Sequence, residues 1–185
     1  METATVQKTT TWAIDPMHSE ILFKVRHLMI TNVKGEFRNF TASIISEGDD
    51  FSKAKVSANI DASSIFTNNT DRDTHLKSAD FFDAENHHSL LFEGTSFTKL
   101  DEENYRLKGM LTMKGIAKEI TLDVEFGGLI TDPYGQAKAG FSVTGKINRK
   151  DWGLNWNAAL ETGGVMVSEE VRISAELQFV QQVEK

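Results

Sequence analysis

The chain has 185 residues, of which 39% are hydrophobic and 25% are charged, so its size and composition fit one soluble globular domain with a sizeable core. The formal net charge of -7 and the pI of about 5.2 disfavour DNA, RNA or an anionic membrane surface as the main partner, because each of these attracts a basic protein face. The absence of cysteine excludes disulfides, thiolate metal sites and cysteine nucleophiles.

The N-terminal segment shows no targeting pattern. Residues 1–10 are polar and Thr-rich, with no basic stretch followed by an apolar one, and we expect them to form a disordered leader. No apolar run in the chain reaches the ~18 residues of a membrane span. We therefore expect a cytoplasmic protein with no membrane span, or a periplasmic or exported one if a signal peptide has been removed.

Hydrophobic and polar residues alternate along most of the chain. In residues 20–26, Ile21, Phe23 and Val25 alternate with charged neighbours, which is typical of a half-buried strand. The same period of two recurs over residues 53–61, 105–112, 119–126, 141–148 and 171–179. Two less regular runs lie near 37–45 and 90–97, so the pattern predicts about eight strands.

Short polar turns at 101–104, 113–115 and 132–135 separate several of these strands. They predict sequential antiparallel pairing, because parallel strands need crossovers of about a dozen residues. Residues 70–79 predict a short helix with Thr70 as its N-cap and Asp73 three residues later. Residues 151–160 predict a helical turn or a structured loop. With no repeat or linker, we expect a single domain over residues 1–185.

Eight antiparallel strands with one apolar face fit two all-β architectures. A sandwich fills its interior with side chains from two sheets, whereas a closed barrel of about eight strands can hold one small ligand. Periodicity does not distinguish these folds. The strand length of about ten residues, or ~30 Å, favours a barrel deep enough for an extended hydrocarbon chain.

Six blocks of the sequence resemble motifs of one protein family, and they occur in the same order along the chain as in that family. They are WAIDPMHSEILFKVRHL (12–28), VKGEFRNF (33–40), the Arg72-Asp73-x-His75-Leu76 segment within 60–95, KGMLTMKGIAKEITLDVEF (108–126), GKINRKDWGL (145–154) and SEEVRISAE (168–176). From Trp12 to about Phe179 the chain resembles the YceI-like family of polyisoprenoid-binding, lipocalin-like bacterial proteins.

The resemblance implies an elongated eight-stranded antiparallel lipocalin-like barrel, often dimeric, with one or two short helices. Its tunnel would hold a polyisoprenoid, an isoprenoid quinone or a long acyl compound. Family members are linked to stress responses and to lipid transport and handling.

The inward faces of the strands supply candidates for the tunnel wall. They are Phe23, Val25, Leu107, Leu122, Val124, Phe126, Phe141, Val143, Ile173 and Phe179. The alternation alone predicts a packed core equally well, and buried strand faces form core more often than ligand walls. The resemblance favours a tunnel for the set as a whole.

The polar residues between the strands supply candidates for the tunnel mouth and a lipid head group: His18, His27, Arg72, His75 and Arg149. The spacing of the histidines fits no metal-binding pattern, and no nucleophile, base and orienting residue occur together, so we expect neither a metal site nor a catalytic one. Arg72 and Arg149 fit head-group contacts or structural ion pairs equally well.

The sequence thus predicts a non-catalytic carrier or reservoir for a long apolar lipid, without a cofactor. One alternative is a stress or interaction module with a packed β core and no lipid. Another is an enzyme that acts on a quinone or isoprenoid, with His18, His27 or His75 as its acid or base.

Overall fold

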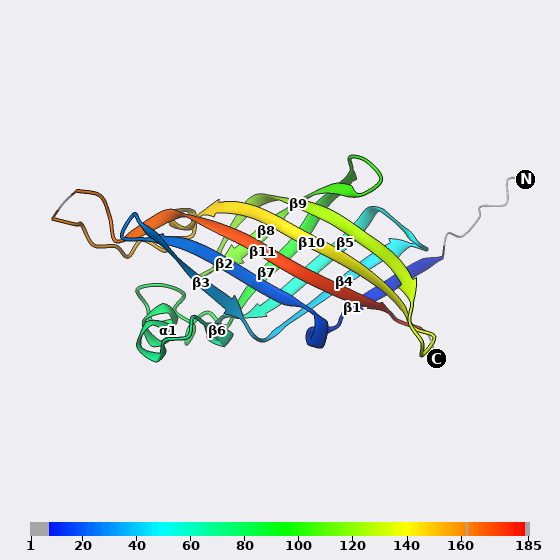
Figure 1. The fold of residues 1–185 in the computed structure, drawn as a ribbon, viewed down its shortest axis with the longest axis horizontal. Helices are drawn as coiled ribbons and strands as arrows, with labels where there is room; N and C mark the ends of the chain where they lie inside the picture. Colours follow the sequence, from blue (N-terminus) through cyan, green and yellow to red (C-terminus); the bar gives the residue numbers. More distant parts are fainter. Residues whose placement is uncertain (1–7, 162, 184–185) are drawn as a thin grey trace, which may run out of the picture.

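A computed structural model describes residues 8–161 and 163–183 (Figure 1). The strands are β1 (Thr9–Ile14), β2 (Glu20–His27), β3 (Thr31–Phe37), β4 (Phe40–Glu47), β5 (Asp50–Asp61), β6 (Ile65–Phe66), β7 (Ser89–Lys99), β8 (Asn104–Met113), β9 (Ile116–Thr131), β10 (Ala137–Asn148) and β11 (Val167–Gln181). The helix α1 spans Thr70–Lys77, and short 3-10 turns lie at η1 (Pro16–His18), η2 (Ala62–Ser64) and η3 (Arg149–Trp152).

All these strands join in one antiparallel sheet that closes on itself. Neighbouring strands follow the order β1-β4-β5-β7-β8-β9-β10-β11, and β1 then pairs with the C-terminal end of β11. The N-terminal part of β11 pairs instead with β2, which pairs with β3. The segments β1 and β2 are thus one interrupted strand, and β3 and β4 are another, so the predicted eight-stranded barrel is confirmed.

The interruption between β1 and β2 has a local cause. Pro16 has no N–H to donate to a sheet, and it opens η1 at the first helical position, where that N–H is not needed. The side chain of Asp15 accepts a hydrogen bond from the N–H of Met17 at 3.0 Å and caps the turn. The chain resumes as a strand at Glu20 and continues along the same edge of β11.

The barrel is elongated because its strands are long (Figure 1). β9 has 16 residues and β11 has 15, which at about 3.3 Å per residue corresponds to roughly 50 Å each. Two glycines admit aromatic rings from neighbouring strands. A Cβ on Gly35 would lie 2.2 Å from the ring of Phe23, and one on Gly109 would lie 2.4 Å from that of Phe92. Only glycine leaves room for these inward-pointing rings.

The helix predicted at 70–79 is present, but its N-cap is Asn69 and not Thr70. The Asn69 side chain accepts a hydrogen bond from the N–H of Arg72 at 3.0 Å. Asp73 does not complete a capping box either, because its carboxylate is buried and accepts hydrogen bonds from the N–H and hydroxyl of Thr67. α1 is therefore tied to the segment that follows β6.

The segment predicted as a helical turn or a loop contains both. The 3-10 turn η3 ends in Gly153, which has a positive φ of 76°. The buried indole of Trp152 donates a hydrogen bond to the carbonyl of Leu111 at 2.8 Å and fixes this turn against β8. Residues 153–161 and 163–166, which we call the 153–166 loop, then lie at the same end of the barrel as α1 (Figure 1).

The alternating runs predicted as strands all lie in strands, but two details of the N-terminal region were not predicted. The run near 37–45 is divided, with β3 ending at Phe37 and β4 beginning at Phe40. β1 begins at Thr9, inside the range expected to form a disordered leader. Residues 1–7 of that range lie outside the described residues.

Candidate functional site

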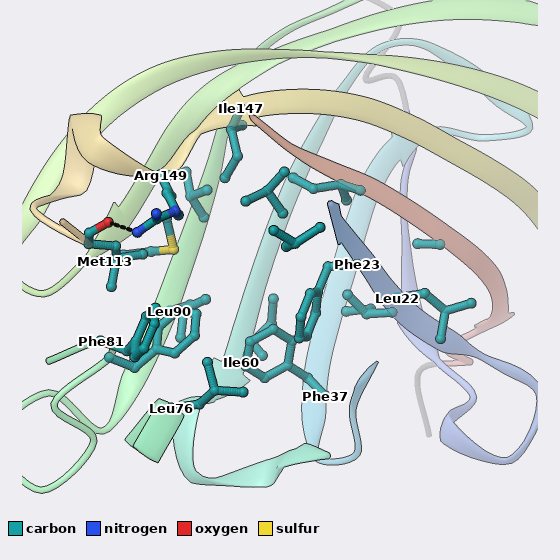
Figure 2. Close-up of a pocket in the computed structure, with 18 of the residues that line it drawn as sticks. Leu22, Phe23, Phe37, Ile60, Leu76, Phe81, Leu90, Met113, Ile147 and Arg149 are labelled. Carbon is teal, nitrogen blue, oxygen red and sulfur yellow. Dashed lines mark hydrogen bonds between the residues drawn. The ribbon is translucent and has the colours of Figure 1, made fainter. Parts of the chain in front are cut away.

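One half of the barrel encloses a cavity of about 570 Å³ (Figure 2). Its wall comes from inward side chains of β2, β3, β4, β5, β7, β8, β9, β10 and β11, and α1 with the turn after it closes one side. The apolar wall includes Ile21, Phe23, Val25, Val33, Phe37, Ala42, Val56, Ala58, Ile60, Leu76, Phe81, Phe82, Leu90, Phe92, Leu107, Leu111, Met113, Ile120, Leu122, Val143, Ile147, Leu154, Trp156, Val171, Ile173, Ala175, Leu177 and Phe179.

The other half of the barrel is filled by aromatic side chains. The ring of Phe51 lies 5.3 Å from those of Trp12 and Phe141, and 5.4 Å from that of Phe126. Phe141 in turn lies 5.9 Å from Phe179, which also borders the cavity. Such tilted and edge-to-face contacts are favourable for aromatic pairs. The barrel is therefore hollow at the α1 end and solid at the end where β1 and β11 pair.

The predicted wall residues divide between these two halves. Phe23, Val25, Leu107, Leu122, Val143, Ile173 and Phe179 line the cavity. Val124, Phe126 and Phe141 also point inward but pack in the aromatic half, outside the cavity. Strand alternation shows which face a side chain occupies but not its level along the barrel axis. Contact of these residues with a ligand stays a prediction.

Several wall residues were not among the sequence candidates. β5 contributes Val56, Ala58 and Ile60, whose alternation with polar neighbours carries the same signal as the chosen strands. Phe81 and Trp156 come from segments without strand periodicity, and their rings lie 5.5 Å apart. No sequence pattern places these two side chains together, because the barrel brings the segment after α1 against the 153–166 loop.

The charged residues that border the cavity are Arg26, Asp71, Arg72 and Arg149. Three arginines against one aspartate make this border locally positive, although the whole chain carries a net charge of -7. Arg72 donates hydrogen bonds to the hydroxyl of Thr67 at 2.8 Å and to its carbonyl. These bonds tie the side chain of Arg72, in α1, to Thr67, the residue that follows β6, at the border of the cavity.

Arg149 is buried in the wall and has no carboxylate partner among the described residues. Its guanidinium donates to the carbonyls of Leu154 and Trp156, at 2.5 and 2.9 Å, and also to those of Ser168 and Val167, at 2.9 and 3.3 Å. Figure 2 shows this side chain among the apolar residues of the wall, with one of its hydrogen bonds drawn as a dashed line. Arg149 itself thus forms no ion pair among the described residues, whereas its neighbour Lys150 pairs with Glu169 at 2.8 Å.

The surroundings of Arg149 shift the pKa of its guanidinium downwards. Burial lowers the pKa of the Arg149 guanidinium, because an apolar wall solvates a cation less well than water, and the charge of Glu169 opposes this effect. The backbone carbonyls supply the negative dipole ends that a carboxylate would otherwise provide. A positive charge is thus fixed beside an apolar cavity by these carbonyls.

The three candidate histidines occupy different places. His18 lies in η1, away from the cavity, with Nδ1 2.8 Å from a carboxylate oxygen of Asp15. His27 borders the cavity at the end of β2. His75 also borders it, and its Nε2 lies 2.9 Å from Asp80. The three do not form one site.

His75 links α1 to the 153–166 loop. Its ring meets those of Phe81 and Trp156 edge to face, at 5.0 and 4.8 Å. This geometry supports packing between the two segments at the border of the cavity. Across residues 8–161 and 163–183, no group of three or more His, Asp or Glu side chains is arranged to hold a metal ion. The helices described in the same ranges include none that is long and apolar enough to span a membrane.

The comparisons with known proteins agree with this architecture. A family model described as YceI-like domain matches residues 12–179. A UPF0312 protein of Staphylococcus aureus is 44% identical over 171 residues, which cover 92% of this chain and 97% of that protein. A solved Campylobacter jejuni YCEI protein is 33% identical, with a TM-score of 0.73 over 87% of this chain and 91% of that chain.

A more distant structure shares the fold alone. A polyisoprenoid binding domain from Saccharophagus degradans is 14% identical, with a TM-score of 0.64 over 92% of this chain and 98% of that chain.

Proposed function

Because this chain belongs to the YceI-like family, we propose that it binds a long apolar lipid in its barrel and acts as a carrier or reservoir without catalysis. The lipid class is a polyisoprenoid, an isoprenoid quinone or a long acyl compound. The binding of a polyisoprenoid by the Saccharophagus degradans domain supports the first of these. Lipid transport, a role in stress and a homodimeric state are further predictions of the resemblance.

The observation that carries this proposal is the apolar cavity. The volume of 570 Å³ lies in the range of small-molecule sites, and an apolar molecule that fills it gains ~25 cal/mol for each Å² of apolar surface removed from water. Water is a poor filling, because a buried water needs two to four polar partners and this wall is almost entirely apolar. A bound apolar molecule supplies the missing contacts.

The arrangement of the cavity also orients the ligand. The aromatic half stops the tail at Phe179, while Arg72 and Arg149 lie at the border where α1 and the 153–166 loop meet the barrel. We therefore place the hydrocarbon along the strands and its polar head near the two arginines. The fixed charge of Arg149 favours a head group with a carboxylate, phosphate or carbonyl oxygen.

The first test is native mass spectrometry of freshly purified protein, followed by organic extraction and identification of the released compound. We expect a discrete added mass that extracts as an isoprenoid, a quinone or a long acyl compound. A bare polypeptide mass, with no uptake when geranylgeraniol, ubiquinone and oleate are offered, would refute the proposal. That result would favour the module without a bound lipid.

A further inference from the structure

The turn between β2 and β3 exposes three consecutive apolar side chains, Leu28, Met29 and Ile30, which we call the apolar tip. Their exposed fractions are 38%, 53% and 73%. Turns at the ends of a barrel are ordinarily polar, since each exposed apolar side chain forgoes the free energy of burial. The tip lies at the hollow end of the barrel, beside the 153–166 loop (Figure 1).

The backbone conformation of this turn is unfavourable for Leu28 and Met29. The N–H of Ile30 donates to the carbonyl of His27 at 3.2 Å, and both intervening residues have positive φ, 52° at Leu28 and 65° at Met29. Positive φ at both central residues is typical of a type I′ turn, for which Asn-Gly is the preferred pair. Leucine and methionine are strained in this region. Folding alone therefore does not explain these side chains.

The apolar tip adjoins the cavity. Arg26 and His27, which precede it in β2, border the cavity, as does Met166 of the 153–166 loop. The N–H of Leu28 donates to the carbonyl of Met166 at 2.8 Å. The Met29 side chain lies against Gly164, where a Cβ would meet its Cγ at 3.4 Å. A surface that engages the tip would thus lie next to the cavity border.

A row of cations crosses the outer face of the sheet near the tip. Lys34, Lys24, Arg172 and Lys146 are successive register partners on β3, β2, β11 and β10, and we call them the basic row. Like charges directly opposite one another destabilise a sheet. Arg172 has a partner in Glu170 at 3.4 Å, but in the described ranges no acidic group lies within 4.0 Å of the three lysine ammonium groups.

We propose that the apolar tip and the basic row together form a docking surface for an anionic lipid bilayer. Lys24 and Lys34 are four residues from Leu28 and Ile30, which places them about 13 Å along the strands from the tip. Interfacial segments bury their apolar side chains ~5–10 Å into the boundary between head groups and acyl chains. Insertion of the tip therefore brings the row near the lipid phosphates.

Charge complementarity favours a bilayer over a second copy of this chain. A two-fold dimer whose axis passes through the basic row would set two basic rows face to face. Anionic lipids instead neutralise the row and relieve its internal repulsion. The net charge of -7 argues against general attraction to such a surface, and this local cluster is the exception. Docking would present the cavity border to the membrane, so that a lipid transfers without crossing water.

The test is co-sedimentation of the purified chain with vesicles of phosphatidylglycerol and phosphatidylcholine, compared with vesicles of phosphatidylcholine alone. We expect binding to the anionic vesicles, weakened by salt at about 0.5 M, where charges are screened. The double variant Lys24→Gln/Lys34→Gln should weaken binding about 25-fold, since each lysine near such a surface contributes about fivefold. Lys53→Gln/Lys55→Gln, an equal charge change on exposed residues of β5, should leave binding unchanged.

The apolar tip has its own variant. Leu28→Asn/Met29→Gly supplies the pair that the turn geometry prefers, so the protein should melt at the same or a higher temperature. Its vesicle binding should fall at least about tenfold, because only Ile30 of the apolar tip remains to enter the bilayer. The control Ile130→Asn removes an apolar side chain that is 66% exposed, against 73% for Ile30, at the opposite end of the barrel. It should leave vesicle binding unchanged.

Three results would overturn the proposal: no binding of the wild-type chain to anionic vesicles, undiminished binding by the Asn-Gly variant, or a dimer in sedimentation velocity that this variant alone abolishes. Uptake of geranylgeraniol from solution is measured in parallel. A chain that takes up geranylgeraniol but does not co-sediment with anionic vesicles would refute docking and leave the proposed function intact.

Discussion

Replacing Ala58 by Trp directs a large side chain into the hollow half of the barrel, because Ala58 lies in the cavity wall on β5. A buried aromatic side chain covers ~150–250 Å², which at ~25 cal/mol per Å² corresponds to ~4–6 kcal/mol before losses in side-chain freedom. We expect the ligand-free variant to be at least as stable as the wild-type chain and to take up far less lipid.

The matched control is the same substitution at Ala139, on β10. Ala139 is 1% exposed and packs in the solid half of the barrel, opposite Phe179. Overpacking a filled core costs ~1–3 kcal/mol, or roughly 3–9 °C in melting temperature for a chain of this length. Thermal unfolding of delipidated protein and extraction of bound lipid measure the two effects. Equal destabilisation by Ala58→Trp and Ala139→Trp would refute the division into a hollow and a solid half.

Three further predictions concern single residues. Arg149→Lys should destabilise the chain by about 3 kcal/mol in urea unfolding, because one ammonium group cannot reach all the carbonyls that the guanidinium holds; an unchanged midpoint would contradict this role. Gly109→Ala should cost about 3 kcal/mol in the same assay, because its Cβ would lie 2.4 Å from the Phe92 ring and 2.6 Å from a backbone oxygen, and a cost below about 1 kcal/mol would show that β8 shifts to admit the methyl group. The pKa of Asp61 is lowered, mainly by its hydrogen bond from the Ser63 hydroxyl. The stabilising effect of that carboxylate is therefore present above about pH 4 and is lost as the pH falls through its folded pKa. Asp61→Asn should make the free energy of unfolding fall less steeply with decreasing pH in this range, and curves parallel to those of the wild-type chain would exclude the effect.

The sequence by itself determined the class of fold. The period of two in segments such as 119–126 and 171–179 reports burial of one strand face, which is a local property, and short polar turns such as 132–135 require antiparallel neighbours. Six ordered sequence blocks indicated the family, and the family match confirms it. These inferences succeed because each depends on residues close together in the chain.

The tertiary structure decided which inward residues border a cavity. Val143 lines the hollow half while Phe141, two residues earlier on the same face, belongs to the solid half. The alternation is identical at both positions, and the difference arises from the rings that β1, β5 and β11 bring to that level of the barrel. The sequence reports the side of a strand, whereas the depth of a side chain along the barrel follows from the register of all eight strands.

The tertiary structure also decided the role of the charged residues. An ion pair was as good an expectation for Arg149 as a head-group contact. No local pattern shows that the loop after η3 and the first residues of β11, 5–19 residues later, will surround Arg149 with carbonyls. Likewise, Lys24, Lys34, Lys146 and Arg172 are scattered in the sequence, and only the register of four strands aligns them. Packing and charge clusters of this kind depend on contacts between distant segments, which a closed barrel fixes only when every strand is in place.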